Sequence, residues 1–309
     1  MPLNSPTNDP LQKFLAGTLY VVATPIGNLK DITFRALEIF EKVALIAAED
    51  TRHTRKLLAH FNIKSRLLAY HEHNEEQSAK GIMEKLRAGS SVALVSNAGT
   101  PTVSDPGYRL INAAIREHIT VVPVPGVSAA VTALSASGLP SDRFCFFGFL
   151  PARSKKRLEA LKAIEGLEST LIFYESPKRI IPVMEDMLSV LGDRYAVLSR
   201  EMTKAYEEFL RGPLSELVDE LRNRQAVKGE ITLLIAGGKP DPLVDFEDIR
   251  QQVEVALKNG RKGVLALAKE FSKSSGISKN LLYEKIQQLK RQIEQTPDGG
   301  KGENTNGQT

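Results

Sequence analysis

The fold is indicated first by residues 91–110, which read SVALVSNAGTPTVSDPGYRL. Residues 92–96 form an apolar run typical of a buried strand, and residues 108–117 carry the pattern of a helix. The loop between them, residues 96–107, consists of small, polar residues rich in Pro and Gly. It is longer than a connection requires, and such loops on a rigid sheet commonly hold ligands. This stretch therefore predicts a strand–loop–helix unit of an α/β sheet.

The same alternation of strands and helices extends over residues 17–126. We expect strands at 19–23, 43–47, 67–70, 92–96 and 120–124, and helices at 33–41, 51–61, 76–88 and 108–117. Continuous Val, Ile, Leu and Ala runs separated by helices predict a mostly parallel sheet that is covered on both faces. Residues 17–126 are therefore the expected N-terminal α/β domain, which ends where Pro125 and Gly126 break the chain.

Residues 127–238 have a different order of elements and are the expected second α/β domain. We expect strands at 144–149, 169–174, 195–199, 205–211 and 229–236, and helices at 128–136, 155–164, 179–191 and 213–222. Residues 201–211 and 229–237 have the pattern of an antiparallel, hairpin-like pair. The second domain is therefore expected to contain a mixed sheet.

A helical unit and a tail are expected after the second domain. Residues 245–291 predict three helices, at 246–258, 262–271 and 278–291, with Ser278 as an N-cap and a turn at 274–276. Their spacing resembles a helix-turn-helix. Residues 295–309 are polar and rich in Gly, Asn and Thr, which predicts a disordered tail.

The composition restricts the class of protein. A formal net charge of +4 tolerates a nucleic-acid partner without requiring one. Cys145 is the only cysteine, which excludes an internal disulfide and a cysteine-based zinc cluster. The first ten residues have neither a basic nor an apolar region, and no run of about 18 apolar residues occurs. We therefore expect a cytoplasmic enzyme with no signal peptide and no membrane contact.

Four loop motifs lie at strand ends, where open α/β sheets bind ligands. They are TPIGNL (24–29), AAEDTRHT (47–54), SNAGTPTVSDPG (96–107) and PVPGVSAA (123–130). No dinucleotide or P-loop fingerprint is present, which disfavours those phosphate sites. Each motif also has a simpler explanation, such as an ordinary turn at Gly27, helix-dipole complementation by Glu49 and Asp50, or Asp105 as a helix N-cap.

Taken together, these motifs resemble the tetrapyrrole (corrin/porphyrin) methylase family and, more narrowly, its branch that modifies ribosomal RNA. Four further motifs follow in the family's order: FGFLP (147–151), FYESPKR (173–179), REMTK (200–204) and GEIT (229–232). The resemblance covers residues 17–238. One departure is Asn97, where this branch usually has aspartate. Asparagine keeps an acceptor but removes the charge, so a charged role at this position is in doubt.

The resemblance implies a two-domain tetrapyrrole-methylase-like fold with a cleft that binds S-adenosyl-L-methionine without a metal. It implies 2′-O-ribose methylation of a cytidine in the decoding region of 16S rRNA, within the small ribosomal subunit, by a homodimer. The residues matched to the cofactor are Pro25, Gly27, Asn28, Asn97, Ala98, Gly99, Thr100, Val103, Asp105, Ser128, Ala129, Tyr174, Glu175, Met202, Ile231 and Thr232.

The catalytic residues matched to this cleft are Lys204, Glu201, Asp50 and Glu230. A ribose hydroxyl is a weak nucleophile until its proton is accepted, and we hypothesise that Lys204 or Glu201 orients or deprotonates it. The expected RNA contacts are Arg52, His53, Lys178, Arg179, Lys269 and Lys279. A surface ion pair is the alternative explanation for each of these residues.

Two other functions remain open at this point. One is a tetrapyrrole C-methyltransferase on the same fold, and the other is a non-catalytic RNA-binding or assembly factor. The AAEDTRHT motif and the basic helical unit count against a porphyrinoid substrate, which needs neither, since lysines in such a unit suit RNA phosphates. The intact loop motifs count against a non-catalytic protein.

Overall fold

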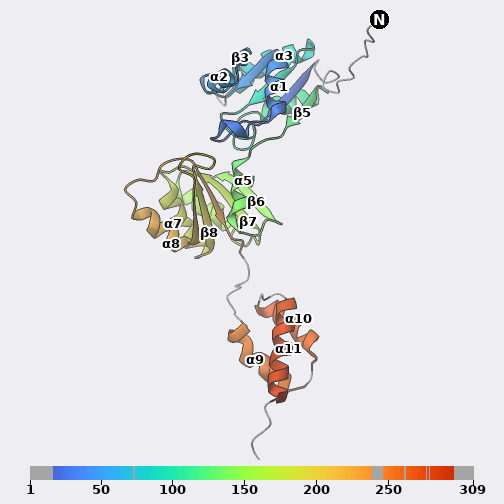
Figure 1. The fold of residues 1–309 in the computed structure, drawn as a ribbon, viewed down its shortest axis with the longest axis vertical. Helices are drawn as coiled ribbons and strands as arrows, with labels where there is room; N and C mark the ends of the chain where they lie inside the picture. The colour runs from blue at the N-terminus through green and yellow to red at the C-terminus, as the bar shows by residue number, and fades with distance from the viewer. Residues whose placement is uncertain are drawn as a thin grey trace, which may run out of the picture. The chain divides into compact units, whose positions relative to one another are not determined.

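The computed structural model describes residues 17–71, 74–238, 246–260, 262–275, 277 and 279–295. The expectations for residues 1–10, for the N-cap at Ser278 and for residues 296–309 lie outside the described residues. Both sheets belong to one compact unit that ends at Gly237, and three helices form a second unit. In Figure 1 the chain runs from blue through these sheets to the orange and red helices.

The first sheet is entirely parallel, with the strand order β3-β2-β4-β1-β5. Its strands are β1 (Thr18–Val22), β2 (Leu45–Ala48), β3 (Leu67–Ala69), β4 (Val92–Val95) and β5 (Thr120–Val124). The helices between them are η2 (Leu29–Asp31), α1 (Phe34–Lys42), α2 (Thr51–His60), α3 (Glu75–Arg87) and α4 (Tyr108–Arg116). The predicted parallel sheet is confirmed.

Two apolar clusters explain why these strands are hydrophobic along their whole length. Tyr20 and Val22 of β1 pack with residues of α1 and α2, whereas Leu19 packs with residues of α3 and α4. Alternate side chains of a strand point to opposite faces, so both faces of this sheet are covered. The helices therefore leave the strand ends and their loops as the places where a ligand can reach the sheet.

The second sheet is mixed, as predicted, with the order β6-β7-β10-β8-β9. Its strands are β6 (Phe144–Phe149), β7 (Thr170–Glu175), β8 (Tyr195–Arg200), β9 (Glu208–Pro213) and β10 (Ile231–Ile235). Its helices are α5 (Ala129–Ser137), α6 (Ser154–Lys162), α7 (Ile180–Leu191) and α8 (Leu214–Arg222). Only the β6–β7 pair is parallel.

The predicted pairing of residues 201–211 with 229–237 is wrong. Strand β10 lies between β7 and β8, and β9 pairs with β8 at the edge, while residues 201–207 form turns and bends. All five residues of β10 are buried, so this strand needs a neighbour on each side. The half-exposed strand β9 tolerates the edge position.

The second unit contains α9 (Phe246–Lys258), α10 (Val264–Ser275) and α11 (Lys279–Gln295). Its core includes Val253, Leu267 and Ile286. Helix α10 continues through Ser275, so residues 274 and 275 of the expected turn are helical, and residue 276 lies outside the described residues. Helix α11 includes Gln295, the first residue of the expected tail. No helix in the described part of the chain combines the length and apolarity needed to cross a membrane.

Candidate active site

The loops that follow β1 and β4 are joined at the carboxyl edge of the first sheet. The N–H of Thr24 donates to the carbonyl of Gly99, and the N–H of Gly99 donates back to Thr24, both at 2.9 Å. The buried hydroxyl of Thr24 donates to the carbonyl of Ser96 at 3.2 Å. These bonds hold the TPIGNL and SNAGTPTVSDPG motifs together as one rigid surface.

A cavity of about 310 Å³ opens beside these joined loops. It is bounded by the β4–α4 loop, the start of α5, the end of β7 and the start of β10. Most of the residues predicted to hold the cofactor line it, namely Ala98, Gly99, Thr100, Val103, Asp105, Ser128, Ala129, Tyr174, Glu175, Met202, Ile231 and Thr232. The motifs thus meet at one place although they are spread over more than half of the chain.

Several lining residues were not predicted individually. They are Ile26, Ser104, Phe149, Ser176, Pro177 and Gly229. Each lies inside one of the eight motifs, so the motifs themselves carried the signal. Which side chain in a motif faces the cavity depends on backbone direction, which the sequence does not show. Phe149 is the most prominent omission, because its ring is 56% exposed and lies edge-on to Tyr174, with ring centroids 5.8 Å apart.

The cavity is lined by three carboxylates, Asp105, Glu175 and Glu230, and by no Lys, Arg or His among its described lining residues. Burial raises the pKa of Asp105 to about 6, a hydrogen bond from Ser96 opposes this shift, and the charge of Glu49 adds to it. Asp105 has no ion-pair partner in the described part of the chain. Glu175 and Glu230 are paired with Arg179 and Lys204, which lie outside the lining. Asp105 is therefore the carboxylate whose charge, when ionised, favours a cationic ligand.

Asp105 is not the N-cap of α4. That position belongs to Gly107, which has a φ of 135°, and no side chain caps the helix there. A Cβ at Gly107 would lie 2.7 Å from Leu94 Cδ2, so the chain passes close to the sheet at this point. Asp105 lines the cavity and does not cap the helix.

Glu175 supplies a buried acceptor at the cavity. Its Oε1 accepts the N–H of Ser176 at 2.7 Å, and its side chain is 2% exposed. Its Oε2 lies 3.2 Å from Arg179 Nη2 but accepts no hydrogen bond within the described residues. A buried acceptor without a donor is costly unless a ligand or water supplies one. Glu175 is thus suited to receive a donor from a bound molecule.

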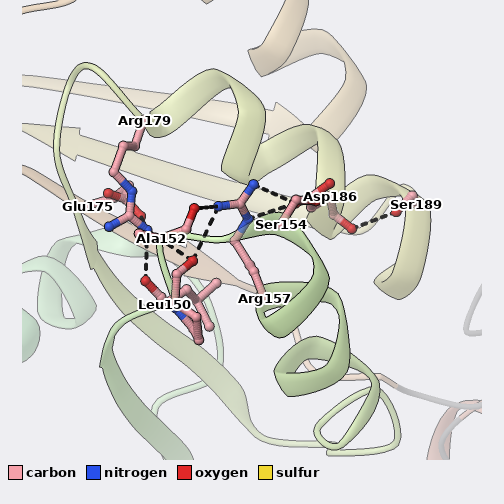
Figure 2. A network of polar contacts seen from close by, with 9 residues as sticks. Leu150, Ala152, Ser154, Arg157, Glu175, Arg179, Asp186 and Ser189 are labelled. Carbon is pink, nitrogen blue, oxygen red and sulfur yellow. Dashed lines mark hydrogen bonds and ion pairs between the residues drawn. The ribbon is translucent and has the colours of Figure 1, made fainter.

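Arg179 and Arg157 together fix the loop that follows Phe149 (Figure 2). Arg179 Nη2 donates to the carbonyl of Leu150 at 2.7 Å. The buried Arg157 donates to Asp186 Oδ2 at 2.7 Å and to the carbonyl of Ala152 at 3.1 Å. The predicted RNA contact Arg179 is therefore engaged inside the protein. Its neighbour Lys178 is exposed.

Lys204, Glu201 and Glu230 form a connected group at the edge of the cavity. Lys204 Nζ lies 2.8 Å from Glu201 Oε1 and 3.0 Å from Glu230 Oε2. Glu201 Oε1 also accepts the backbone N–H of Glu230 at 3.0 Å. Of the two carboxylates, Glu230 lines the cavity and is 75% exposed, whereas Glu201 is 20% exposed.

The hydrogen bonds in this group decide the charges of its members. Partial burial acts to lower the pKa of Lys204, but its bonds to Glu201 and Glu230 outweigh burial and hold the pKa above its ordinary value. The bond from Lys204 lowers the pKa of Glu201. Lys204 is therefore a cation at neutral pH and has no lone pair with which to accept a proton. The available proton acceptor of the group is the carboxylate of Glu230.

Gly27 and Asn28, predicted to hold the cofactor, contact the Lys204 loop and do not line the cavity. A Cβ at Gly27 would lie 2.5 Å from Lys204 Cγ and 2.7 Å from Thr203 Oγ1, so only glycine allows this approach. The N–H of Asn28 donates to Thr203 Oγ1 at 3.0 Å. Glu201 and Thr203 have positive φ values of 51° and 67°. Such strained backbone is often found at functional sites.

Asp50 and Asn97 lie at the ends of β2 and β4, away from the lining of the cavity. Asp50 caps α2 and pairs with Arg52 at 3.0 Å, and its hydrogen bond from Arg52 lowers its pKa to about 2. Asn97 Oδ1 accepts the N–H of Asp50, and the N–H of Asn97 donates to Glu49 Oε2, both at 3.1 Å. Asn97 therefore joins the two loops through an acceptor, a role that needs no charge.

The remaining predicted residues lie outside the cavity. Pro25, His53 and Asn97 line a separate small hollow of about 120 Å³. Arg52 is 84% exposed, although it pairs with Asp50. Lys269 of α10 and Lys279 of α11 are exposed in the helical unit. All of these except Pro25 and Asn97 were predicted as RNA contacts, and their exposure is compatible with that role.

Comparison with known proteins places these observations in a family. Residues 18–218 match the model of the family described as Tetrapyrrole (Corrin/Porphyrin) Methylases. The chain is 51% identical over 272 residues to "Ribosomal RNA small subunit methyltransferase I" of Escherichia coli O157:H7, with 86% of this chain and 93% of that protein covered.

Solved structures show the same fold at lower identity. A diphthine synthase superposes with a TM-score of 0.56 at 18% identity, covering 71% of this chain and 90% of the other. A uroporphyrin-III C-methyltransferase from Thermus thermophilus, complexed with S-adenosylhomocysteine, superposes with a TM-score of 0.50 at 18% identity, covering 70% of this chain and 96% of the other. At this identity the likeness shows the fold alone.

Proposed function

This chain belongs to the tetrapyrrole (corrin/porphyrin) methylase family and is a methyltransferase, and we propose that it transfers the methyl group of S-adenosylmethionine to small-subunit ribosomal RNA. The observation that carries the proposal is the carboxylate-lined cavity, in a chain that is 51% identical to a relative named for this RNA. In the finer form of the proposal the product is a 2′-O-methylated cytidine in the decoding region of 16S rRNA, made by a homodimer.

The chemistry of the cavity fits S-adenosylmethionine. Bound there, this molecule supplies an electrophilic methyl group on a positively charged sulfur. The carboxylates of Asp105 and Glu230 favour that charge, and Glu175 Oε2 is available to accept a hydrogen bond from a ligand donor. Small residues such as Gly99 and Ala129 leave room for a folded ligand.

Proton removal from the ribose is assigned to Glu230. In an in-line displacement the ribose oxygen forms a bond to the methyl carbon as the carbon–sulfur bond breaks, and the hydroxyl proton passes to the Glu230 carboxylate. Lys204, held as a cation, orients Glu230 through their 3.0 Å contact. Glu201 fixes Lys204 and the backbone of Glu230. The sequence led to the hypothesis that Lys204 or Glu201 orients or deprotonates the hydroxyl; in this proposal both act indirectly, by holding Glu230.

The test is transfer of labelled methyl from S-adenosylmethionine to three acceptors: protein-free small-subunit RNA, assembled small subunits and a porphyrinoid. We expect label only on RNA or subunits. A 2′-O-methyl group blocks alkaline cleavage at its own nucleotide, so a gap in the alkaline ladder identifies both the ribose and the position. Label on the porphyrinoid would contradict the proposal. Label on RNA without such a gap would contradict the ribose chemistry.

A further inference from the structure

The segment from α2 to β3 has an unusual charge distribution. Residues 51–71 contain five Lys and Arg residues, Arg52, Arg55, Lys56, Lys64 and Arg66, and no Asp or Glu. All five are exposed. Elsewhere in the same unit, exposed arginines are commonly paired, as Arg87 is with Glu117 at 2.6 Å. The α2–β3 segment therefore carries a concentrated, largely uncompensated positive charge.

Three of these cations surround a hollow. Arg55, Lys64 and Arg66 line a depression together with apolar and small residues of α2 and the turn before β3, including Ala59 and Ser65. Within the described part of the chain, none of the three cations has a hydrogen-bond or ion-pair partner. The hydroxyl of Ser65 donates to the carbonyl of Phe40, so the turn between the cations is anchored to the protein. The hollow is thus a fixed, concave, positively charged surface.

Helix α2 also lines a second hollow, whose other residues include some that adjoin cavity-lining residues in the sequence. His53 and Lys56, on the same helix, line the small hollow that also contains Pro25 and Asn97. The residues next to these in sequence, Ile26 and Ala98, line the cavity. Helix α2 spans ten residues, or about 15 Å, from the carboxyl edge of the sheet towards its amino edge. Its exposed face can therefore follow several nucleotides of an RNA strand.

We propose that Arg55, Lys64 and Arg66, with the exposed face of α2, form the docking surface for the phosphate backbone of the RNA whose ribose is methylated in the cavity. The proposal rests on the proposed function, because it takes the substrate to be RNA. Residues 51–71 contain no Asp or Glu that could compete with RNA phosphates for these cations. Contacts to phosphates do not depend on the base sequence. None of these three residues belongs to the groups assigned to cofactor or proton transfer.

The experiment uses full-length protein with Arg55, Lys64 and Arg66 all replaced by Gln. Its matched control is the triple variant K155Q/K156Q/K162Q, which removes three exposed cations of α6 that have no hydrogen-bond or ion-pair partner in the described residues. Binding of protein-free small-subunit RNA is measured over a salt series. Affinity for S-adenosylmethionine and methyl transfer to RNA are measured on all three proteins.

We expect the hollow variant to bind RNA at least about tenfold more weakly and to lose about 2 units of the logarithmic salt slope, since each phosphate contact on a single strand contributes about 0.7. Its affinity for S-adenosylmethionine is expected to equal that of the wild type, which confirms folding. The α6 control should keep both the RNA affinity and the slope.

Two results overturn the inference while leaving the proposed function intact. In both, the wild-type protein methylates RNA. In the first, the hollow variant keeps its RNA affinity and salt slope. In the second, the α6 control loses as much RNA affinity and salt slope as the hollow variant. If the wild type itself transfers no methyl group to RNA, the proposed function fails first.

Discussion

Two depressions of the same α/β unit have opposite chemistry. The cavity at the strand ends is lined by the carboxylates of Asp105, Glu175 and Glu230 and by no cation among its described lining residues. The hollow beside α2 is lined by Arg55, Lys64 and Arg66 and by no acid among its described residues. A cationic ligand and an anionic ligand would thus be directed to different places on one surface.

This separation shows why the net charge says little about function. The chain has a formal charge of only +4, which is weak support for an RNA partner. The two depressions differ from this average. One is lined by acids, of which Glu175 and Glu230 are paired with Arg179 and Lys204, and the other is lined by bases without a partner in the described residues. An enzyme that brings a sulfonium compound and a polyanion together needs such a division, since either charge in the wrong depression would repel its ligand.

The largest expected effect comes from removing the proton acceptor of the cavity. Glu230→Gln keeps the shape of the side chain but loses the carboxylate, so methyl transfer should fall about 10²- to 10⁴-fold, the usual range for a general base. Affinity for S-adenosylmethionine should change only slightly, because Glu230 is one of three carboxylates. Single-turnover transfer to RNA measures the rate, and Glu41→Gln, an exposed glutamate on α1, is the control. A rate within about threefold of wild type would remove Glu230 from the mechanism.

The next effect comes from the contact between Gly27 and the Lys204 loop. A methyl group at Gly27 would lie 2.5 Å from Lys204 Cγ, so Gly27→Ala should displace the Lys204–Glu230 pair. We expect kcat to fall about 10- to 100-fold, since small displacements of catalytic groups have effects of this size.

Gly81→Ala is the matched control for this change. Gly81 lies within α3, and a Cβ there meets nothing within 4 Å. Alanine should stabilise the helix by up to about 1 kcal/mol without changing kcat. Equal kcat values in the two variants would show that the close approach at Gly27 has no part in positioning Lys204.

A smaller effect is expected from the charge of Asp105. Its pKa is raised to about 6, so the carboxyl is neutral at pH 5 and mostly ionised at pH 7. Affinity for S-adenosylmethionine should therefore increase as the pH rises through 6. Asp105→Asn should bind about fivefold more weakly at pH 7.5, equivalent to about 1 kcal/mol, and should lose this pH dependence.

The stability of the protein provides a second test of Asp105. Because its folded pKa is raised, its contribution to stability is greatest at low pH and is lost as the pH rises through about 6. Asp105→Asn should remove this pH-dependent loss of stability. The measurements are calorimetric titrations and thermal unfolding between pH 5 and pH 7.5. A pH-independent affinity in the wild type would contradict the assignment of Asp105.

The smallest effect tests the other depression. Ala59→Glu introduces one acid into the hollow beside Arg55, and it should weaken RNA binding about threefold, since single surface charges contribute little. Affinity for S-adenosylmethionine should stay the same. Ala59→Gln has a similar size without the charge and serves as the control in filter-binding titrations. Equal weakening by both variants would mean that bulk, and not charge, causes the effect.

The order of elements and the general place of the site could be predicted from the sequence. The strands of the first sheet were predicted because their apolar runs are continuous, and continuous runs follow from burial on both faces. The motifs at the strand ends indicated the cavity because the carboxyl ends of parallel strands share one edge. Both signals are local in the sequence, so they can be recognised without the tertiary structure.

Pairing and side-chain direction were decided only by the tertiary structure. Strand β10 inserts between β7 and β8 because it must be buried on both edges, and no local pattern shows which neighbours are available. Lys204 and Glu230 are equally conspicuous in the sequence, yet only the 2.8 and 3.0 Å contacts of Lys204 show that its ammonium lies between two carboxylates. These contacts are the reason that the proposal makes Glu230, and not Lys204, the proton acceptor. The sequence by itself determined the family and the segments of the site. Long-range contacts determined the charge and role of each side chain, because a pKa depends on neighbours that are distant in the chain.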